Sequence, residues 1–183
     1  MYRRDIEDIT AKIKSSQFFF FFAFGLFDWL NIEAKFGTGD IADDQYNGQK
    51  FYYNYNWGGG YGFRIRVYES ENIKFIFGVH HASIHPDPNK NTDNLTHRAI
   101  LDETQFDLNL ALKGQRFTPY VGAKVSRARL IRRIDGERAT LKQEENYGII
   151  GGFDYMFGKN TRLNIEGRFI DEYAITCGIG YTF

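Results

Sequence analysis

Apolar and polar side chains alternate at every second position along much of this 183-residue chain. In the closing stretch AITCGIGYTF, apolar side chains alternate with small or weakly polar ones up to the last residue. Seven stretches upstream share this period, which belongs to a β-strand with two different faces. The pattern therefore predicts eight strands, at residues 30–36, 61–68, 73–79, 106–113, 121–126, 147–157, 162–169 and 174–183.

The connections between these predicted strands differ in length at the two ends. They are tight after residues 68, 113 and 157, but long and polar after residues 36 and 79. Short turns on one rim and larger loops on the other are typical of transmembrane β-barrels. We therefore expect an all-β fold, an eight-stranded antiparallel up-and-down transmembrane β-barrel over residues 26–183.

The period alone does not say which face of each strand points inward. In a soluble lipocalin-like carrier the apolar face would enclose an apolar ligand, whereas in a membrane barrel it would contact lipid. Charges of both signs on the polar faces, and aromatic residues near the strand ends, favour the membrane barrel. That interpretation predicts a charged lumen built from Glu33, Lys35, Arg64, Arg66, Lys74, Asp107, Lys113, Lys124, Asp154, Arg162, Glu166 and Arg168.

An eight-stranded barrel has an interior that side chains can fill. We therefore expect a plug of charge pairs rather than a general diffusion pore, which makes the protein porin-like only in its architecture. The predicted lumen holds eight basic and four acidic residues. Because of this excess, a weak anion leak is the one channel activity that the sequence suggests.

Composition removes several other classes of function. Lys plus Arg and Asp plus Glu both number 23, so no basic excess points to nucleic acid. The single cysteine, Cys177, excludes an internal disulfide and a cysteine-based zinc cluster. No apolar run approaches the length of a membrane-spanning helix. We expect a monomer, with no cofactor and no metal site.

Residues 1–25 do not fit the strand pattern. Basic residues at the start are followed by the apolar run FFFFFAFGLF, which resembles a short secretory signal. Ala23, Phe24 and Gly25 could supply the small residues of a cleavage site. The alternative is an amphipathic periplasmic helix over residues 2–15 that leads into the first strand.

The last 70 residues, from FTPYVGAK through GGFDYMFGKNTRLNIEGRF to CGIGYTF, resemble the small OmpA/OmpX-type outer-membrane β-barrel family. The resemblance implies a place in the bacterial outer membrane, contact with its lipid, and insertion by the barrel assembly machinery. Members end in a strand with a C-terminal aromatic residue that this machinery reads, and Ile179, Tyr181 and Phe183 match it. A structural or surface-interaction role would use the loops at Asp40–Gln49, Pro86–Thr96 and Arg132–Thr140 to contact a ligand or protein partner.

One motif raises an enzymatic alternative. The stretch VHHASIHPD places His81 and Ser83 on one face of a predicted strand, and Asp102 could lie on the same face. A histidine, a serine and an acid together can activate a hydroxyl for acyl transfer, as an outer-membrane lipid acyl hydrolase would require. The motif has only a weak resemblance to lipid A deacylases, and the simpler interpretation is that these side chains meet headgroups and water at the rim.

Overall fold

The computed structural model describes residues 13–46, 49–90, 96–134 and 136–181. Its long strands are β2 (Gln17–Phe27), β3 (Leu30–Tyr46), β4 (Gln49–Glu69), β5 (Ile73–Ile84), β7 (Thr96–Leu112), β8 (Phe117–Ile134), β10 (Tyr147–Phe157), β11 (Thr161–Phe169) and β12 (Ala174–Tyr181). Three shorter strands are β1 (Ile13–Lys14), β6 (Asn89–Lys90) and β9 (Glu137–Lys142). The all-β class is therefore confirmed. In the part of the chain that the structure describes, no helix is long and apolar enough to cross a membrane.

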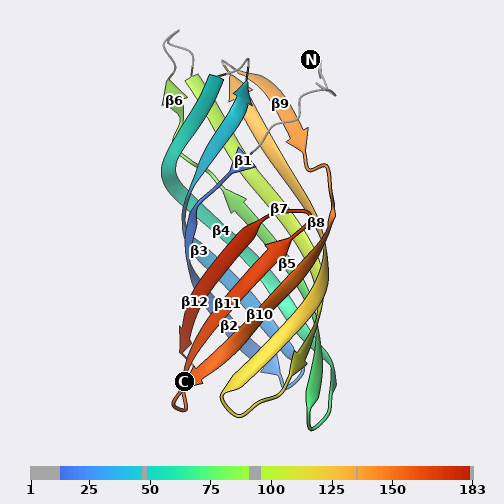
Figure 1. The fold of residues 1–183 in the computed structure, drawn as a ribbon. Coiled ribbons are helices and arrows are strands. Elements are labelled where there is room, and N and C mark those ends of the chain that lie inside the picture. The colour runs from blue at the N-terminus through green and yellow to red at the C-terminus, as the bar shows by residue number, and fades with distance from the viewer. Residues whose placement is uncertain (1–12, 47–48, 91–95, 135, 182–183) are drawn as a thin grey trace.

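All strands belong to one antiparallel sheet that curls into a tall, barrel-like wall (Figure 1). The order along the sheet is β1-β3-β4-β5-β7-β8-β10-β11-β12, with β2 also paired to β3, β6 to β7 and β9 to β8. Curling brings opposite walls of the sheet together. The buried ion pair between Arg132 on β8 and Asp43 on β3 shows this contact.

Each of the eight predicted strands overlaps one long strand of the sheet. The long strands extend beyond the residues that the alternating pattern predicted. The predicted loops at Asp40–Gln49 and Arg132–Thr140 are largely the ends of β3, β4, β8 and β9. Their backbones pair in register, as Ile41 does with Tyr53 and Arg132 does with Ala139. In the predicted loop at Pro86–Thr96, residues 91–95 lie outside the described residues, as does Phe183 at the chain end.

Strand β2 is an addition to the prediction, since most of it falls within the signal-like segment. It pairs along β3 from Gln17 to Phe27, which gives nine long strands among the described residues rather than eight. The periplasmic helix suggested for residues 2–15 is wrong at its end, because Ile13 and Lys14 form β1; residues 2–12 lie outside the described residues. In the described chain no pairing joins β2 to β12, so the sheet has two free edges.

The interior changes character along the barrel axis. At the end that holds the β3–β4 and β8–β9 hairpins (upper in Figure 1), a buried apolar cluster comprises Ile41, Phe51, Tyr53, Ala99 and Leu130. Burial there raises the pKa of Tyr53 to about 12. Below this cluster most inward side chains are charged or polar, with Ile150 and Ala111 as buried apolar exceptions, and Glu33 and Asp107 each expose only 4% of their surface.

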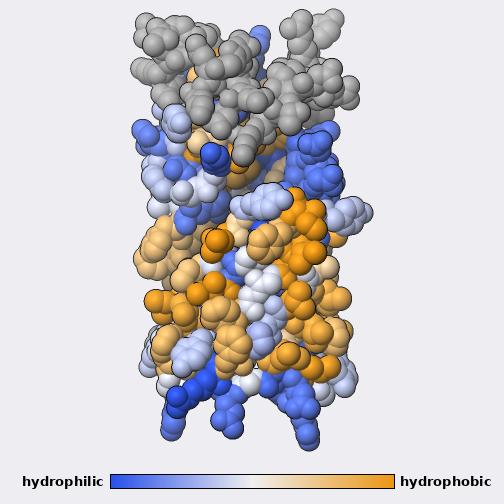
Figure 2. All heavy atoms as spheres, in the orientation of Figure 1, coloured by the Kyte–Doolittle hydropathy of each residue, from blue (hydrophilic) through white to orange (hydrophobic). Residues whose placement is uncertain are grey.

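The outer surface has the opposite distribution of polarity. Figure 2 shows a broad apolar belt with hydrophilic residues above and below it. Leu108 is 49% exposed and Ile179 is 80% exposed. Other exposed apolar side chains are Ile32, Phe36, Phe63, Phe106, Val121, Val125, Ile149 and Ile175. The lower interior and the belt therefore have polarities opposite to those of a water-soluble protein.

Candidate functional site: the charged interior

The first cluster of charges is centred on His80 of β5, which lies between the buried carboxylates of Glu33 on β3 and Asp107 on β7. His80 Nδ1 is 3.4 Å from Glu33 Oε2, and His80 Nε2 is 3.2 Å from Asp107 Oδ2. Arg64 also reaches Glu33, with Nε 3.3 Å from Oε1. Asp107 accepts hydrogen bonds from Gln105 and Asn109 at 2.9 and 2.6 Å. This cluster therefore ties β3, β4, β5 and β7 together from the inside.

A glycine beside His80 makes room for the imidazole. Gly78 pairs with Asp107 across β5 and β7. A Cβ at Gly78 would lie 2.7 Å from both His80 Nε2 and Asp107 Oδ1, which is too close for a side chain. The glycine in this strand thus permits the imidazole and the carboxylate to meet inside the wall.

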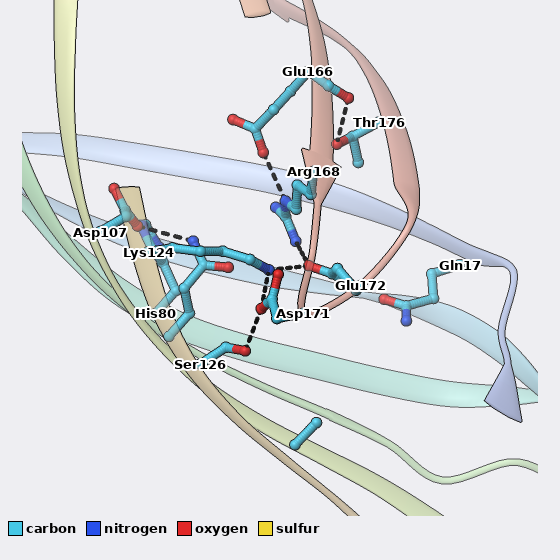
Figure 3. Close-up of polar contacts among 12 residues, drawn as sticks. Gln17, His80, Asp107, Lys124, Ser126, Glu166, Arg168, Asp171, Glu172 and Thr176 are labelled. Carbon is cyan, nitrogen blue, oxygen red and sulfur yellow. Dashed lines mark hydrogen bonds and ion pairs between the residues drawn. The ribbon is translucent and has the colours of Figure 1, made fainter. Parts of the chain in front are cut away.

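The second cluster is centred on Lys124 of β8, and Figure 3 shows its contacts. Lys124 Nζ is 2.9 Å from Asp171 Oδ2, and both side chains are fully buried. Lys124 also pairs with Glu172, whose Oε1 lies 3.4 Å from a terminal nitrogen of Arg168. Arg168 Nε is in turn 2.8 Å from Glu166 Oε1. The result is a continuous chain of alternating charges across the interior.

The connection between β11 and β12 places the acids of this second cluster. Ile170 has a φ of 84°, a conformation that is rare and costly for a β-branched residue. The two residues that follow, Asp171 and Glu172, both pair with Lys124. On the facing strand, a Cβ at Gly148 would overlap Asp171 Oδ1, so glycine leaves the space that this carboxylate occupies.

Below the second cluster, a polar network of neutral and charged groups continues along the interior. The Tyr120 hydroxyl donates to Glu166 Oε2 at 2.9 Å. Asn164 donates to the Tyr120 oxygen at 3.0 Å and to Asp154 Oδ1 at 2.9 Å. Arg162 lies 3.8 Å from Asp154 Oδ2 at the edge of this network. These contacts extend the polar filling toward the short turns.

The remaining predicted lumen residues divide into two groups. Arg66 and Lys113 both pair with Glu69 at the turn rim, where their side chains are about one-third exposed, so they do not fill the lumen. Hydrogen bonds from Lys113 and Arg66 lower the pKa of Glu69. Lys35 lies with its Nζ 5.2 Å from the centre of the Phe19 ring. Lys74 lies close enough to Asp154 and Arg162 for their charges to act on it.

Sequence reasoning missed several acids and the central histidine. His80 lies two positions after Gly78, on the same face of the strand as Lys74 and Gly78. Extending the predicted strand to His80 would have placed this side chain inside the barrel. Asp171 and Glu172 lie in a predicted connection between two strands, where side chains do not alternate between two faces. Together with Glu103, which shares the inward parity of Asp107, they reduce the predicted basic excess of the lumen.

On the outer face, the predicted His81, Ser83 and Asp102 group forms two pairs rather than one triad. Ser83 Oγ is 3.0 Å from Nε2 of His85, and His85 stacks on Trp57. His81 Nδ1 is 3.1 Å from the Thr104 hydroxyl, and its Nε2 is 3.4 Å from Asp102 Oδ1. Among the described residues, no group of three histidine, cysteine or acidic side chains converges on a metal site.

The sequence matches no known protein-family model and no curated protein.

Proposed function

We propose that this protein is an integral β-barrel of the bacterial outer membrane with a lumen closed by charged side chains. The observation that carries the proposal is the inverted polarity of the lower barrel. Glu33, Asp107 and Lys124 are buried there, whereas Leu108 is half exposed on the outside. In water such an arrangement exposes apolar surface and buries charge, both of which are unfavourable. In a bilayer the outward apolar face would contact lipid, and the inward position would keep the charges away from hydrocarbon.

The length of the outward apolar face fits this proposal. On β10, the outward side runs from Tyr147 to Phe157 with no charged residue, over 11 residues. At about 3.4 Å per residue this face is ~34 Å long along the strand, and a tilt of about 40° reduces its height to ~26 Å. Transmembrane barrels carry an apolar band about 25 Å tall.

The same inverted polarity argues against a soluble lipocalin-like carrier. That class needs an apolar cavity and a solvated outer wall. Here the buried apolar cluster lies at the upper end, around Tyr53 and Leu130. The belt below it has the reverse arrangement, so the carrier would place its ligand among ion pairs.

The role that this architecture supports is structural and surface-directed rather than porin-like transport. The Lys124 and His80 clusters lie at the same level of the interior, because Asp107 is paired with Lys124 across β7 and β8, so ions would have to pass between buried charge pairs. The hairpin β3–β4 and the hairpin β8–β9 extend above the belt and offer polar surface to a ligand or protein partner. Membrane insertion would use the assembly machinery, with Ile179 and Tyr181 facing outward on the last strand.

We further propose that the barrel closes between β3 and β12, as an eight-stranded antiparallel barrel. In an up-and-down sheet β12 runs antiparallel to β3 but parallel to β2, and antiparallel closure is the common arrangement. Strand β2 also places Phe19 and Phe21 on the face that carries Lys35 on β3, so it would bring aromatic residues into a charged lumen. Intact mass measurement of protein extracted from membranes tests this. Loss of residues 1–25 supports the closure, and retention of the full chain overturns it.

Two measurements test membrane insertion. The purified protein should require detergent, and its mobility on a denaturing gel should change after boiling, because closed membrane barrels resist detergent until they are heated. The single Cys177, exposed on the outward face of β12, should be protected from a water-soluble maleimide in lipid vesicles and react after unfolding. The matched control is Lys159→Cys in a Cys177→Ser background, which places the thiol in a turn and should react in both states. Monomeric solubility without detergent would refute the proposal.

A second candidate function is acyl-ester hydrolysis, which has one observation in its favour. Ser83 Oγ lies 3.0 Å from His85 Nε2, so the imidazole can accept the hydroxyl proton as the oxygen attacks an ester carbonyl. The leaving alcohol would take that proton, and water would release the acid. Ser83→Ala should then abolish release of fatty acid from membrane lipid in reconstituted vesicles, and unchanged release would exclude this candidate.

A further inference from the structure

A group of basic side chains lies on the outer face of β7, β8 and β9 directly above the apolar belt, in rows that the paired Ile100 and Ile131 interrupt. We call this group the basic patch; its members are Arg98, Arg127, Arg129, Arg133, Arg138 and Lys142. Each lies outward by parity, because Ala99, Leu130 and Arg132 between them point into the barrel. Five of the six are exposed and Arg129 is partly exposed. In Figure 2, blue residues cover the region of β9 above the orange belt.

The strand register places these cations directly opposite one another. Arg133 is paired with Arg98 on one side and with Arg138 on the other, and Arg129 is paired with Lys142. Directly opposed side chains on one face of a sheet lie within about 5.5 Å at Cβ, so like charges there destabilise the pairing. No salt bridge to the basic patch occurs within the described ranges, although Asp102 lies opposite Arg129. A bound anion would remove this repulsion.

A shallow open hollow of about 320 Å³ lies at the top of the basic patch. Its walls are formed by Thr96, Arg98, Arg133 and Gly136. Two of these four residues are arginines from adjacent, directly paired positions. A hollow between two such guanidinium groups suits a phosphate, which arginine can bind through two parallel hydrogen bonds.

The position of the basic patch along the strands identifies the class of anion. Phe106 and Val125 are paired in the belt, and the next outward pair along the same strands is Thr104 and Arg127. Each further pair lies about 6.8 Å along the strand, or ~5 Å in height at a tilt of about 40°. The patch therefore extends over ~15 Å, from the belt edge to the row of Arg98 and Arg133. A phospholipid headgroup layer is only about 5–7 Å thick, so a larger headgroup is needed to cover it.

We infer that the basic patch binds a phosphorylated glycolipid, whose acyl chains lie against the belt and whose sugar phosphates contact the arginines. This inference rests on the proposed membrane function, because the belt must be at the level of the acyl chains. The lower cations would then meet the phosphates nearest the acyl chains. The row of Arg98, Arg133 and Arg138 would meet phosphates further along the headgroup.

The test is binding of purified bacterial lipopolysaccharide, intact or dephosphorylated, to the detergent-solubilised full chain by microscale thermophoresis. The variant is Arg133→Gln with Arg138→Gln, which removes two cations from an exposed surface. The matched control is Arg116→Gln with Lys159→Gln, which removes two cations from the turns at the opposite end of the barrel. At about fivefold per basic residue near a charged lipid surface, the patch variant should bind about 25-fold more weakly. The control variant should bind as the unmodified protein does.

Three results would overturn the inference. They are equal affinity of the patch variant and the unmodified protein, equal affinity for dephosphorylated lipopolysaccharide, and full competition by inorganic phosphate, which would mean that the glycolipid is not the ligand. The heat-dependent gel shift is measured on the same samples. A normal shift with unchanged binding refutes the lipid site alone, whereas solubility without detergent and no shift refute the membrane function and the lipid site together.

Discussion

Lys124→Met is the substitution that tests the charged interior most directly. Lys124 and Asp171 bury their side chains completely and lie 2.9 Å apart, and Glu172 shares the same ammonium group. Methionine has a similar length but no charge, so the variant leaves Asp171 without its cationic partner. Removing one member of a buried pair costs about 3–5 kcal/mol, far more than an exposed pair contributes.

The assay is equilibrium unfolding in urea, with the protein in detergent micelles and the gel shift as the signal. With a denaturant slope of about 2 kcal/mol per molar urea, a loss of about 4 kcal/mol lowers the midpoint by ~2 M. Lys159→Met, in an exposed turn, is the control and should leave the midpoint unchanged. Adding Asp171→Asn to Lys124→Met removes the unpaired charge and should recover part of the loss. If Lys124→Met unfolds at the same urea concentration as Lys159→Met, the interior is not held by buried charge pairs.

Five other substitutions address separate parts of the structure, and equilibrium unfolding measures the effect of each. Leu108→Arg should destabilise the protein by about 2–4 kcal/mol in lipid vesicles, the cost of a charge facing hydrocarbon, and little effect would contradict the orientation of the belt. Gly148→Ala should be strongly destabilising because its Cβ overlaps Asp171, whereas Gly151→Ala, with open space around the new Cβ, should be tolerated. Ile170→Gly should raise stability by about 1 kcal/mol by relieving the positive φ, and an unchanged or lower stability would contradict this. The pKa of Glu69 is lowered in the folded state, so its stabilisation is present above the ordinary carboxyl pKa and is lost as the pH falls through the lowered pKa. Glu69→Gln should therefore be less sensitive to acid than the unmodified protein.

The alternating period was sufficient to locate the eight strands because each one separates two different environments. On β7, Phe106 and Leu108 point outward while Asp107 between them is buried. A one-residue shift of register would turn Phe106 and Leu108 inward and Asp107 outward. The sequence therefore constrains both the register of the strand and the direction of its side chains. This is why the strand positions could be predicted from the sequence.

The same reasoning failed where one of its assumptions did not hold. In Phe18–Phe22 there is no alternation, and the segment resembled a signal; in the structure it pairs along β3, since backbone pairing needs no alternation. In the upper hairpins the outward residues are polar enough to resemble loops. Their inward positions, such as Ile41 and Tyr53, are apolar but widely spaced, and only the pairing across strands joins them into a core.

The candidate site was predicted in its charges but not in its partners. Lys124, Glu166 and Arg168 were expected on the polar face, yet the acids that hold Lys124 come from a connection beyond the end of a strand. Their inward direction follows the positive φ of Ile170, which no periodic pattern could indicate. Sequence periodicity therefore predicts the direction of side chains that alternate along strands. The direction of side chains in a turn that bends inward can be seen only in the structure.

Side-chain polarity changes along the barrel axis, on the outer face and on the inner face, and the change repeats along neighbouring strands. On β7 the outward side chains change from Phe106 to Asp102 and Arg98. On β8 they change from Val125 to Arg127 at the paired level, and on β5 from Val79 to His81 at the corresponding row. At nearly the same height the inward side chains change from charged to apolar. A soluble barrel has no reason to exchange its inner and outer chemistry at one level around its wall. The proposed position of the barrel, partly in hydrocarbon and partly in water, accounts for the change on the outer face, since the medium outside would change there while the strands continue.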